Sequence, residues 1–472
     1  MKRTFFCTAA SLLLASAAAA QAPSVAGLWQ GGIQVAPTNE LKAYFDLKGT
    51  APVLTGSMSV PQQTGKSFPL SSVVVRHDSL LLGAEALRGR FAGKLSADGQ
   101  QVAGVWYQNG AQLPLTLRRT TEQARAAAAP RRPQTPQAPF PYQSQNLTFP
   151  NKQAGFDLAG TLTLPTGKGP FPAVVLVSGS GPQDRNETIL GHQPFLVLAD
   201  YLTRRGFAVL RYDDRGVGQS KGTFKGTLTT DFTTDAQAAM AYLRTRADIR
   251  PHQVALMGHS EGGAIVWQTA AQPGGPDLAV SLAGPGLPGD AVLLRQQKDI
   301  ARAQGADSAA IGANFRLNHA LFAELRRQPA SLPAVELAAK LAAVAQQQPG
   351  LAAATAQQLA GIYSGPWMRA FLTSEQASYL AKVKCPVLAL NGTNDLQVAA
   401  DENLPAIARG LQAARNRDVT TRALPQLNHL FQTDPAAKAD YGNIEETFAP
   451  AALQIIGDWL SAHTGAKGVA GR

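Results

Sequence analysis

The sequence predicts an α/β protein with a mostly parallel sheet and helices on both faces, preceded by a small all-β domain. Two observations carry this prediction. From Gln145 onward, short apolar runs alternate with helical patterns, as in parallel sheets whose strands are joined by helices. From Val25 to Leu117, short alternating runs are broken by Gly, Pro, Asn and Asp, which indicates antiparallel strands joined by tight turns. A chain of 472 residues has room for two or three domains.

The first residues have the composition of an export signal. Basic residues in Met1–Arg3 precede an apolar stretch, Phe5–Ala20, that ends in small residues. This order is typical of a secretory signal peptide, with cleavage expected near Ala20 or Ala22. A membrane anchor is the alternative, but the stretch is at the short limit for a spanning helix. We therefore predict a signal peptide over 1–22 and an exported mature chain, periplasmic or extracellular, without a transmembrane segment.

Charge and cysteine content argue against two other classes of protein. The net charge is +11, but the basic residues are scattered and no aromatic residues are interleaved with them, which argues against nucleic-acid binding. Weak attraction to an anionic envelope surface is the simpler consequence. Cys7 leaves with the signal peptide, so the mature chain keeps only Cys385 and cannot form an internal disulfide. An apolar strand pattern follows Cys385, which we expect to be an unreactive core thiol.

The N-terminal domain is expected over residues 23–120, as roughly eight short strands in a small barrel or sandwich. Hairpin turns are predicted at Asp98-Gly99 and Asn109-Gly110, because these dipeptides tolerate positive φ. The following segment, 121–144, contains an alanine run and closely spaced prolines. Proline at this density resists both helix and sheet, so the segment is predicted to be an extended, exposed linker.

The α/β domain is expected over 145–472. Its buried strands are predicted from apolar runs at Leu158–Leu164, Ala173–Ser178, Ala208–Tyr212, Val254–Gly258, Leu278–Ala283, Val387–Asn391 and Val419–Leu424. Its helical patterns include Phe195–Arg205, Thr233–Arg246 and Pro450–His463. The stretch 285–381 has no strand signal and is rich in Ala, Gln and Leu at helical spacing. Because it lies just before a core strand, we interpret it as a helical lid; a helical spacer is the alternative.

The pentapeptide Gly258–Gly262 has the pattern of a nucleophile elbow. It places Ser260 between an apolar strand and a helix, with a glycine two residues before and two residues after it. A serine hydroxyl attacks a carbonyl carbon only if it is exposed to the substrate and lies near a base. The glycines allow strand and helix to approach closely around that turn. Ser260 is therefore the candidate nucleophile.

The candidate base is His429, in the loop between the last predicted strand and the C-terminal helix. Sheet topology brings this loop to the carboxyl edge of the strands, beside the candidate nucleophile. His192 and His259 are rivals. The side chain of His259 is expected to point away from that of its neighbour, and His192 lies before the nucleophile strand. The remaining histidines have the pattern of surface or packing residues.

The candidate acid is Asp395, in the loop that leaves the strand Val387–Asn391. A carboxylate there can reach the imidazole of His429, fix its tautomer and stabilise the imidazolium. Asp401 and Asp434 are weaker candidates, since they fall in a predicted helix or a flanking loop. The alternative role of Asp395 is that of a turn former. The order Ser, Asp, His along the chain is the order expected of an α/β-hydrolase.

An oxyanion hole is also required, because negative charge grows on the carbonyl oxygen during attack. One expected donor is the backbone N–H of Glu261. The other is expected from the loop Ser178–Pro182, with the Ser180 N–H as the best candidate; a plain β-turn is the alternative. No complete dinucleotide fingerprint follows the two glycines of this loop, so no cofactor is expected. No cluster of residues has metal-ligand spacing, so no metal is expected either.

Taken together, the motifs resemble bacterial secreted α/β-hydrolases of the carboxylesterase and serine aminopeptidase-like (acylaminoacyl-peptidase-like) branch, which often carry an N-terminal β-domain. The residues that carry this resemblance are Ser178–Pro182 with Asp184 and Arg185, Tyr212–Gly216 with Gly218 and Ser220, Gly258–Gly263, Gly392 with Asp395, and Asn428-His429. One departure is Ser178, where many relatives have histidine. The resemblance implies a structural role for the turn Asp213–Gly216 in the cleft wall. It leaves Asp184 and Arg185 open, as loop anchors or substrate contacts.

Three hypotheses for function follow. The first is an exported serine hydrolase that cleaves small carboxylic esters through an acyl-enzyme. The second is a serine peptidase, of aminopeptidase or acylaminoacyl-peptidase type, that acts on short peptides with the same triad. The third is an envelope-binding protein that works through its β-domain. Sequence alone sets neither the natural substrate nor the oligomeric state.

Overall fold

The computed structural model describes residues 24–466, except 37–38, 51, 62–66, 109, 129–130 and 439. The predicted signal peptide lies outside the described residues. The chain forms two compact units, which divide between residues 129 and 130. No helix among the described residues is long and apolar enough to span a bilayer.

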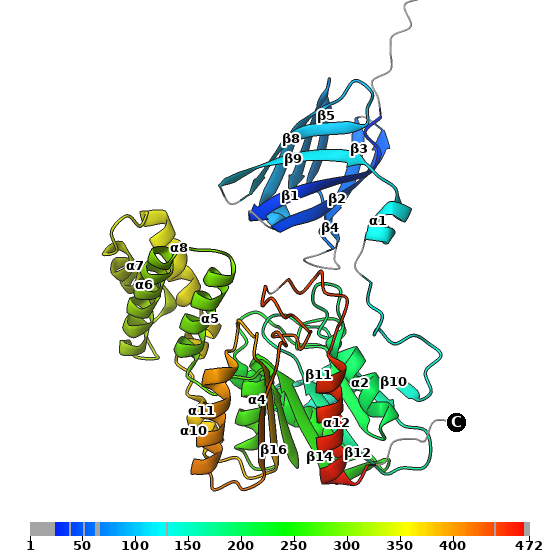
Figure 1. Ribbon diagram of the computed structural model, residues 1–472, viewed down its shortest axis with the longest axis vertical. Helices are drawn as coiled ribbons and strands as arrows, with labels where there is room; N and C mark the ends of the chain where they lie inside the picture. Colours follow the sequence, from blue (N-terminus) through cyan, green and yellow to red (C-terminus); the bar gives the residue numbers. More distant parts are fainter. Residues whose placement is uncertain are drawn as a thin grey trace, which may run out of the picture. The chain divides into compact units, whose positions relative to one another are not determined.

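The N-terminal unit is an antiparallel sheet that curls around one apolar core (Figure 1). Nine strands form where roughly eight were expected, in the order β4-β3-β2-β1-β9-β8-β7-β6-β5. At the turn between β7 and β8, Gly99 has φ +67°, as a hairpin turn after Asp98 requires. The strands are β1 (Gly27–Ala36), β2 (Asn39–Thr50), β3 (Val53–Ser59), β4 (Ser67–Pro69), β5 (Ser72–Arg76), β6 (Ser79–Ala84), β7 (Gly89–Leu95), β8 (Gln101–Gln108) and β9 (Ala111–Arg119).

The segment predicted as an extended, exposed linker is mostly exposed, as expected, but it is structured at both ends, which corrects the expectation that it resists helix and sheet. Its alanine-rich first part forms the helix α1 (Glu122–Ala128), because alanine is a strong helix former until the first proline. Its second part is bound to the C-terminal unit through side chains that pair with backbone groups. Arg132 donates to the Gly442 carbonyl at 2.7 Å, and Gln134 donates to the Phe448 carbonyl at 2.7 Å.

The C-terminal unit contains an eight-stranded sheet in the order β10-β11-β13-β12-β14-β15-β16-β17. The pairs β10–β11 and β11–β13 are antiparallel and the other pairs are parallel. Each strand predicted for this domain is present, and β10 is an additional one. The strands are β10 (Gln143–Asn151), β11 (Phe156–Leu164), β12 (Phe171–Val177), β13 (Ala208–Tyr212), β14 (Ile249–His259), β15 (Leu278–Leu282), β16 (Val387–Gly392) and β17 (Val419–Leu424).

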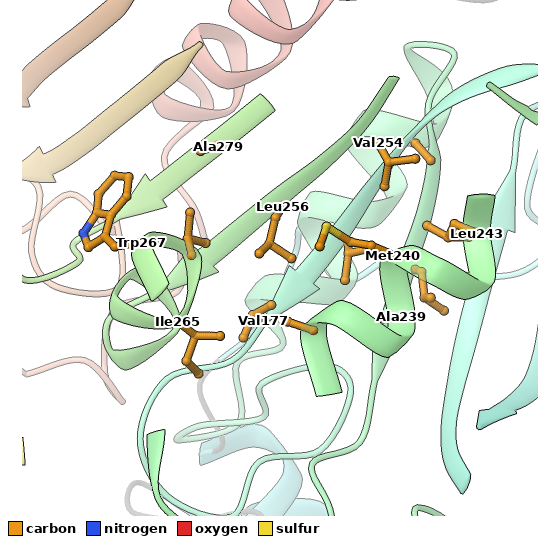
Figure 2. Close-up of a cluster of buried hydrophobic side chains, with 14 of the residues drawn as sticks. Val177, Ala239, Met240, Leu243, Val254, Leu256, Ile265, Trp267 and Ala279 are labelled. Carbon is orange, nitrogen blue, oxygen red and sulfur yellow. The ribbon is translucent and has the colours of Figure 1, made fainter. Parts of the chain in front are cut away.

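Helices cover both faces of this sheet because its central strands are apolar on both sides. Along β14, Val254 and Leu256 face one layer, whereas Ala255 and Met257 face the other. Figure 2 shows the first layer, where side chains of α3 and α4 such as Met240 pack on the strands. This layer contains α3 (Thr229–Arg244), α4 (Glu261–Ala270) and α11 (Ala400–Ala413), and the opposite layer contains α2 (Pro194–Arg204) and α12 (Pro450–Thr464). The fold is that of an α/β-hydrolase.

The predicted insertion between β15 and β16 is helical, as expected. Helices α6 to α8 group beside α5 in Figure 1 and share a small core of their own, which includes Leu321, Phe322 and Leu341. The insertion therefore folds as a subdomain rather than as a set of isolated helices. Its helices are α5 (Gly289–Ala303), α6 (Ser308–Arg327), α7 (Ala334–Gln346), α8 (Ala353–Tyr363), α9 (Pro366–Leu372) and α10 (Gln376–Leu380).

Candidate active site

Ser260 lies at the turn between β14 and α4, in a backbone conformation that non-glycine residues rarely adopt. Its φ is 55° and its ψ is −118°. Two glycines make the turn possible because their Cα atoms lie against backbone. A Cβ at Gly258 would overlap the carbonyl group of Gly262, and a Cβ at Gly262 would overlap the carbonyl oxygen of Val177. The strain and the close packing hold the serine at the apex, as a nucleophile elbow requires.

Asp395 and His429 form a buried carboxylate–imidazole pair. The Nδ1 atom of His429 lies 2.8 Å from Oδ2 of Asp395. The other carboxylate oxygen accepts from the backbone N–H groups of Gln397 at 2.8 Å and Val398 at 2.9 Å. Because a carboxylate only accepts, Nδ1 carries a proton, so in the neutral imidazole Nε2 is the nitrogen with the free lone pair. The pair thus has the tautomer that a general base needs.

The nucleophile candidate faces a cavity of about 580 Å³. Ser260, Glu261 and Ser180 all line it, as do Gln397 and Val398, whose amides bind Asp395. The structure therefore brings the elbow, the proposed oxyanion loop and the acid loop to one place. Among the described residues, no hydrogen bond joins the Ser260 hydroxyl to the imidazole of the candidate base. Catalytic hydrogen bonds are often loose before substrate binds.

The loop after β12, which was expected to supply the second oxyanion donor, lies beside Ser260. A Cβ at Gly179 would lie 3.2 Å from the Cβ of Ser260, so this loop runs directly past the serine. Within the described part of the chain, the backbone amides of Ser180 and Glu261 have no hydrogen-bond acceptor. Ser178 donates through Oγ to Asp214 at 2.9 Å, which anchors the loop. Two unused amides beside the nucleophile are what an oxyanion hole requires.

Asp214, which holds this loop, also makes stability depend on pH. Burial raises its pKa to about 7, although hydrogen bonds from Gln183 and Ser178 oppose the shift. The folded state therefore retains a proton that the unfolded carboxyl loses near pH 3.8. The stabilising contribution is complete below that value and disappears as the pH rises through about 7.

Asp214→Asn should therefore flatten the pH dependence of stability. Between pH 4 and pH 7.5, we expect the Tm of the wild type to fall relative to the Tm of the variant, because asparagine has no proton to lose. Thermal unfolding of both proteins across this range measures the difference. A difference in Tm that stays constant with pH contradicts the prediction.

Asp184 and Arg185 are both engaged within their own part of the structure. Arg185 forms an ion pair with Asp213, with distances of 2.6 Å and 3.0 Å. The Asp184 carboxylate accepts from the backbone amides of Asn186 at 2.9 Å and Thr188 at 3.1 Å. Neither Asp184 nor Arg185 lines the cavity beside Ser260. Of the two roles left open by the sequence, these contacts favour that of loop anchor over that of substrate contact.

The helical insertion contributes side chains to the cavity beside Ser260. The sequence predicted the insertion but not which of its residues reach the site. Trp367 of α9 donates through Nε1 to Oε1 of Glu261 at 2.9 Å, and Thr229 of α3 donates to the same oxygen at 2.5 Å. Burial raises the pKa of Glu261, although these hydrogen bonds act in the opposite direction. Among the described residues, the second oxygen of this carboxylate, Oε2, has no partner. The insertion thus forms one wall of the site and contacts the residue that follows the nucleophile.

His192 and Cys385, the other residues considered in the sequence, do not line the cavity beside Ser260. His192 is buried, with Nδ1 2.9 Å from the Thr447 hydroxyl, and burial lowers its pKa to about 4. It is therefore a neutral packing residue. Burial raises the pKa of Cys385 to about 12, in keeping with an unreactive thiol. Within the described residues, no group of His, Cys, Asp and Glu has the arrangement of a metal site.

Comparison with known proteins places the chain among hydrolases. The family model for the X-Pro dipeptidyl-peptidase (S15) family matches residues 154–421, more than half of the chain. Esterase EstD of Thermotoga maritima is 38% identical over 141 residues, which cover 30% of this chain and 34% of that protein. A putative hydrolase of Bacillus subtilis, YtaP, is 32% identical over 120 residues, which cover 22% of this chain and 40% of that protein. The matches thus span about a third to two fifths of these relatives' length.

Solved structures of similar proteins include esterases. An esterase of Pyrococcus furiosus aligns with 69% of this chain and 91% of its own, with 14% identity and a TM-score of 0.43. A thermophilic esterase from Thermogutta terrifontis aligns with 68% of this chain and 98% of its own, with 18% identity and a TM-score of 0.38.

Proposed function

The chain belongs to the X-Pro dipeptidyl-peptidase (S15) family, and we propose that it is a serine hydrolase that cleaves small carboxylic esters through an acyl-enzyme on Ser260. The observation that carries the proposal is the buried pair of Asp395 and His429, 2.8 Å apart, in loops that end beside the serine elbow. A serine alone is a weak nucleophile at neutral pH, and an oriented imidazole activates it.

The residues have defined roles in the proposed reaction. His429 Nε2 takes the proton of Ser260 as Oγ attacks the ester carbonyl carbon, and Asp395 stabilises the imidazolium. The backbone amides of Glu261 and Ser180 bind the oxyanion of the tetrahedral intermediate. The imidazolium then protonates the leaving alcohol as the acyl-enzyme forms. In the second half-reaction, His429 takes a proton from water, which attacks the acyl carbon. The bond between that carbon and Ser260 Oγ then breaks, the imidazolium returns the proton to Oγ, and the acid is released.

The cavity suits a small substrate with an apolar part. Its volume of about 580 Å³ lies in the range of pockets for small ligands. The apolar side chains that line it come largely from the helical insertion, and they include Val292, Leu293, Met368 and Phe371. We therefore expect the insertion to select the substrate and to act as the lid that its sequence position predicts.

Peptide hydrolysis is the second candidate, and one observation favours it. The Glu261 carboxylate lines the cavity beside Ser260, and its Oε2 has no partner among the described residues. A protonated amine of a short peptide is the group that such an oxygen binds well. The family name points in the same direction, because it describes cleavage of peptides.

Glu261→Gln should change the ratio of the two activities. The variant keeps the backbone amide at residue 261 and removes the negative charge. If peptides bind through their amine, kcat/KM for aminoacyl and Xaa-Pro anilides should fall about tenfold more than kcat/KM for a short-chain aryl ester. Steady-state kinetics with both substrate types measures this ratio. An equal fall on both excludes amine recognition by this carboxylate.

Labelling with a fluorophosphonate probe tests the proposed nucleophile directly. We expect one adduct on the protein, at Ser260, identified by peptide mass spectrometry and absent from Ser260→Ala. No adduct in the folded wild type would favour the third hypothesis, an envelope-binding protein that works through its β-domain.

We also propose that the protein is exported. N-terminal sequencing of the secreted chain tests this, because cleavage is expected near residue 20 or 22.

A further inference from the structure

A second buried histidine–carboxylate pair lies behind the proposed triad. The Nδ1 atom of His259 lies 2.9 Å from Oε1 of Glu187, and its Nε2 lies 2.9 Å from the backbone carbonyl oxygen of His429. The carbonyl oxygen only accepts, and an ionised Glu187 carboxylate also only accepts. Beside an ionised Glu187, both ring nitrogens of His259 therefore donate, which is the hydrogen-bond pattern of an imidazolium.

The charges around His259 agree with this state. Burial by itself lowers the pKa of His259, but the Glu187 carboxylate, the hydrogen bond to the His429 carbonyl and the Asp395 carboxylate together raise it above its usual value. The imidazole of His429 is its nearest titratable ring neighbour, with ring centres 4.9 Å apart. The phenyl ring of Phe431 lies 6.5 Å from the His259 ring, centre to centre, and carries no charge. The pair is therefore a buried ion pair.

The pair of His259 and Glu187 is joined to the proposed oxyanion loop through the Glu187 carboxylate. Its Oε1 also accepts from the backbone amide of Gly179 at 2.7 Å, next to the proposed donor Ser180. Glu187 has φ +52°, a left-handed conformation that is uncommon for a residue with a side chain. Among the described residues, its Oε2 is buried without a hydrogen-bond partner. Both contacts thus converge on a single oxygen.

The pair therefore contacts three parts of the proposed catalytic machinery. Glu187 holds the oxyanion loop, His259 adjoins the nucleophile in sequence, and its ring donates to the backbone of the proposed base. The backbone carbonyl of His429 is fixed by this contact, whereas its side chain is fixed by Asp395. Because a buried ion pair contributes little net stability on average, a gain in stability does not by itself account for this one.

We propose that Glu187 and His259 are positioning residues, whose ion pair holds the oxyanion loop and the backbone of His429 in register with Ser260. The proposal rests on the proposed function, because it takes these parts to be the catalytic ones. Neither residue touches the reacting atoms. Loss of the pair should move the amides and the base relative to the serine by a few tenths of an ångström, which lowers kcat more than it alters KM.

The experiment combines kinetics with nuclear magnetic resonance of the full mature chain. For Glu187→Gln and His259→Gln, we expect kcat for a short-chain aryl ester to fall about 10- to 100-fold while KM stays within about twofold of wild type. Glu187→Asp should recover part of the loss because it keeps the charge. Asp235→Asn is the matched control, since it also removes a buried carboxylate, 2.7 Å from Arg215, that contacts neither loop. It should lower Tm but leave kcat within about threefold of wild type.

The ring protons give a readout that does not depend on activity or on a variant's folding. In wild-type protein labelled with ¹⁵N-histidine, His259 should show two ring N–H signals at pH 7, and both should disappear in His259→Gln. A single ring proton on His259 at pH 7, or unchanged kcat in both glutamine variants, overturns the proposal. A wild type without ester or peptide turnover, or an active Ser260→Ala variant, would instead overturn the proposed function and leave the ring-proton test valid.

Discussion

Ser260→Ala is expected to lower kcat/KM for a short-chain aryl ester by about 10⁴- to 10⁶-fold, because it removes the only atom that forms the acyl bond. The residual rate comes from the oxyanion amides and from substrate binding, which the substitution leaves in place. Alanine carries the same Cβ as serine at φ 55°, so the elbow keeps its shape and its strain. Initial rates with a chromogenic ester, together with the Tm, measure activity and folding separately.

Ser281→Ala is a suitable control for this variant. Ser281 is also buried, on the neighbouring strand β15, and among the described residues its hydroxyl has no hydrogen-bond partner. Its loss should leave the rate within about threefold of wild type. A Ser260→Ala enzyme that kept more than about a hundredth of the wild-type rate would show that another group is the nucleophile.

Asp395→Asn is expected to lower kcat by about 10³- to 10⁴-fold. The amide presents an N–H₂ group or a neutral oxygen to Nδ1 of His429, which favours the wrong tautomer and does not stabilise the imidazolium. The amide oxygen can still accept from the backbone amides of Gln397 and Val398, so the loop should remain folded. Measurements of kcat from pH 6 to pH 10 establish whether the loss persists across the working range.

Asp401→Asn is the matched control, because Asp401 is one of the two rival acids in the sequence, with Asp434. Its side chain is exposed and lies 3.2 Å from Arg295. The control should keep its activity within about twofold. Equal losses in the two variants would mean that Asp395 acts through general charge rather than through the orientation of His429.

Fold prediction succeeded where the signal was local. The apolar runs of the central strands, such as Val254–Gly258, are buried on both faces, so their composition alone indicates a strand. The strand β10 was missed because it lies at the edge of the sheet, alternates in polarity and contains Pro150. The segment 121–144 was misjudged because its composition does not show that Arg132 and Gln134 meet backbone carbonyls of distant loops.

In the candidate site, too, local sequence signals identified some residues, whereas contacts between distant residues needed the structure. Ser260, Asp395 and His429 could be named from the sequence because each follows a recognisable strand, and their roles remain predictions until the variants are measured. The contacts of Asp213 and Asp214 needed the structure, since a pair of acidic residues in a turn has no sequence signature of its partners. The same holds for Trp367, which reaches Glu261 from a helix 106 residues away.

The sequence by itself therefore determined the strand–loop–helix units and the chemical groups at their ends, because these depend on residues that are neighbours along the chain. Only the tertiary structure decided which groups meet. Glu187 and His259 are 72 residues apart, and His259 and the His429 carbonyl are 170 apart. Such contacts arise when parallel strands align their carboxyl ends in one sheet, and no local pattern of residues specifies them.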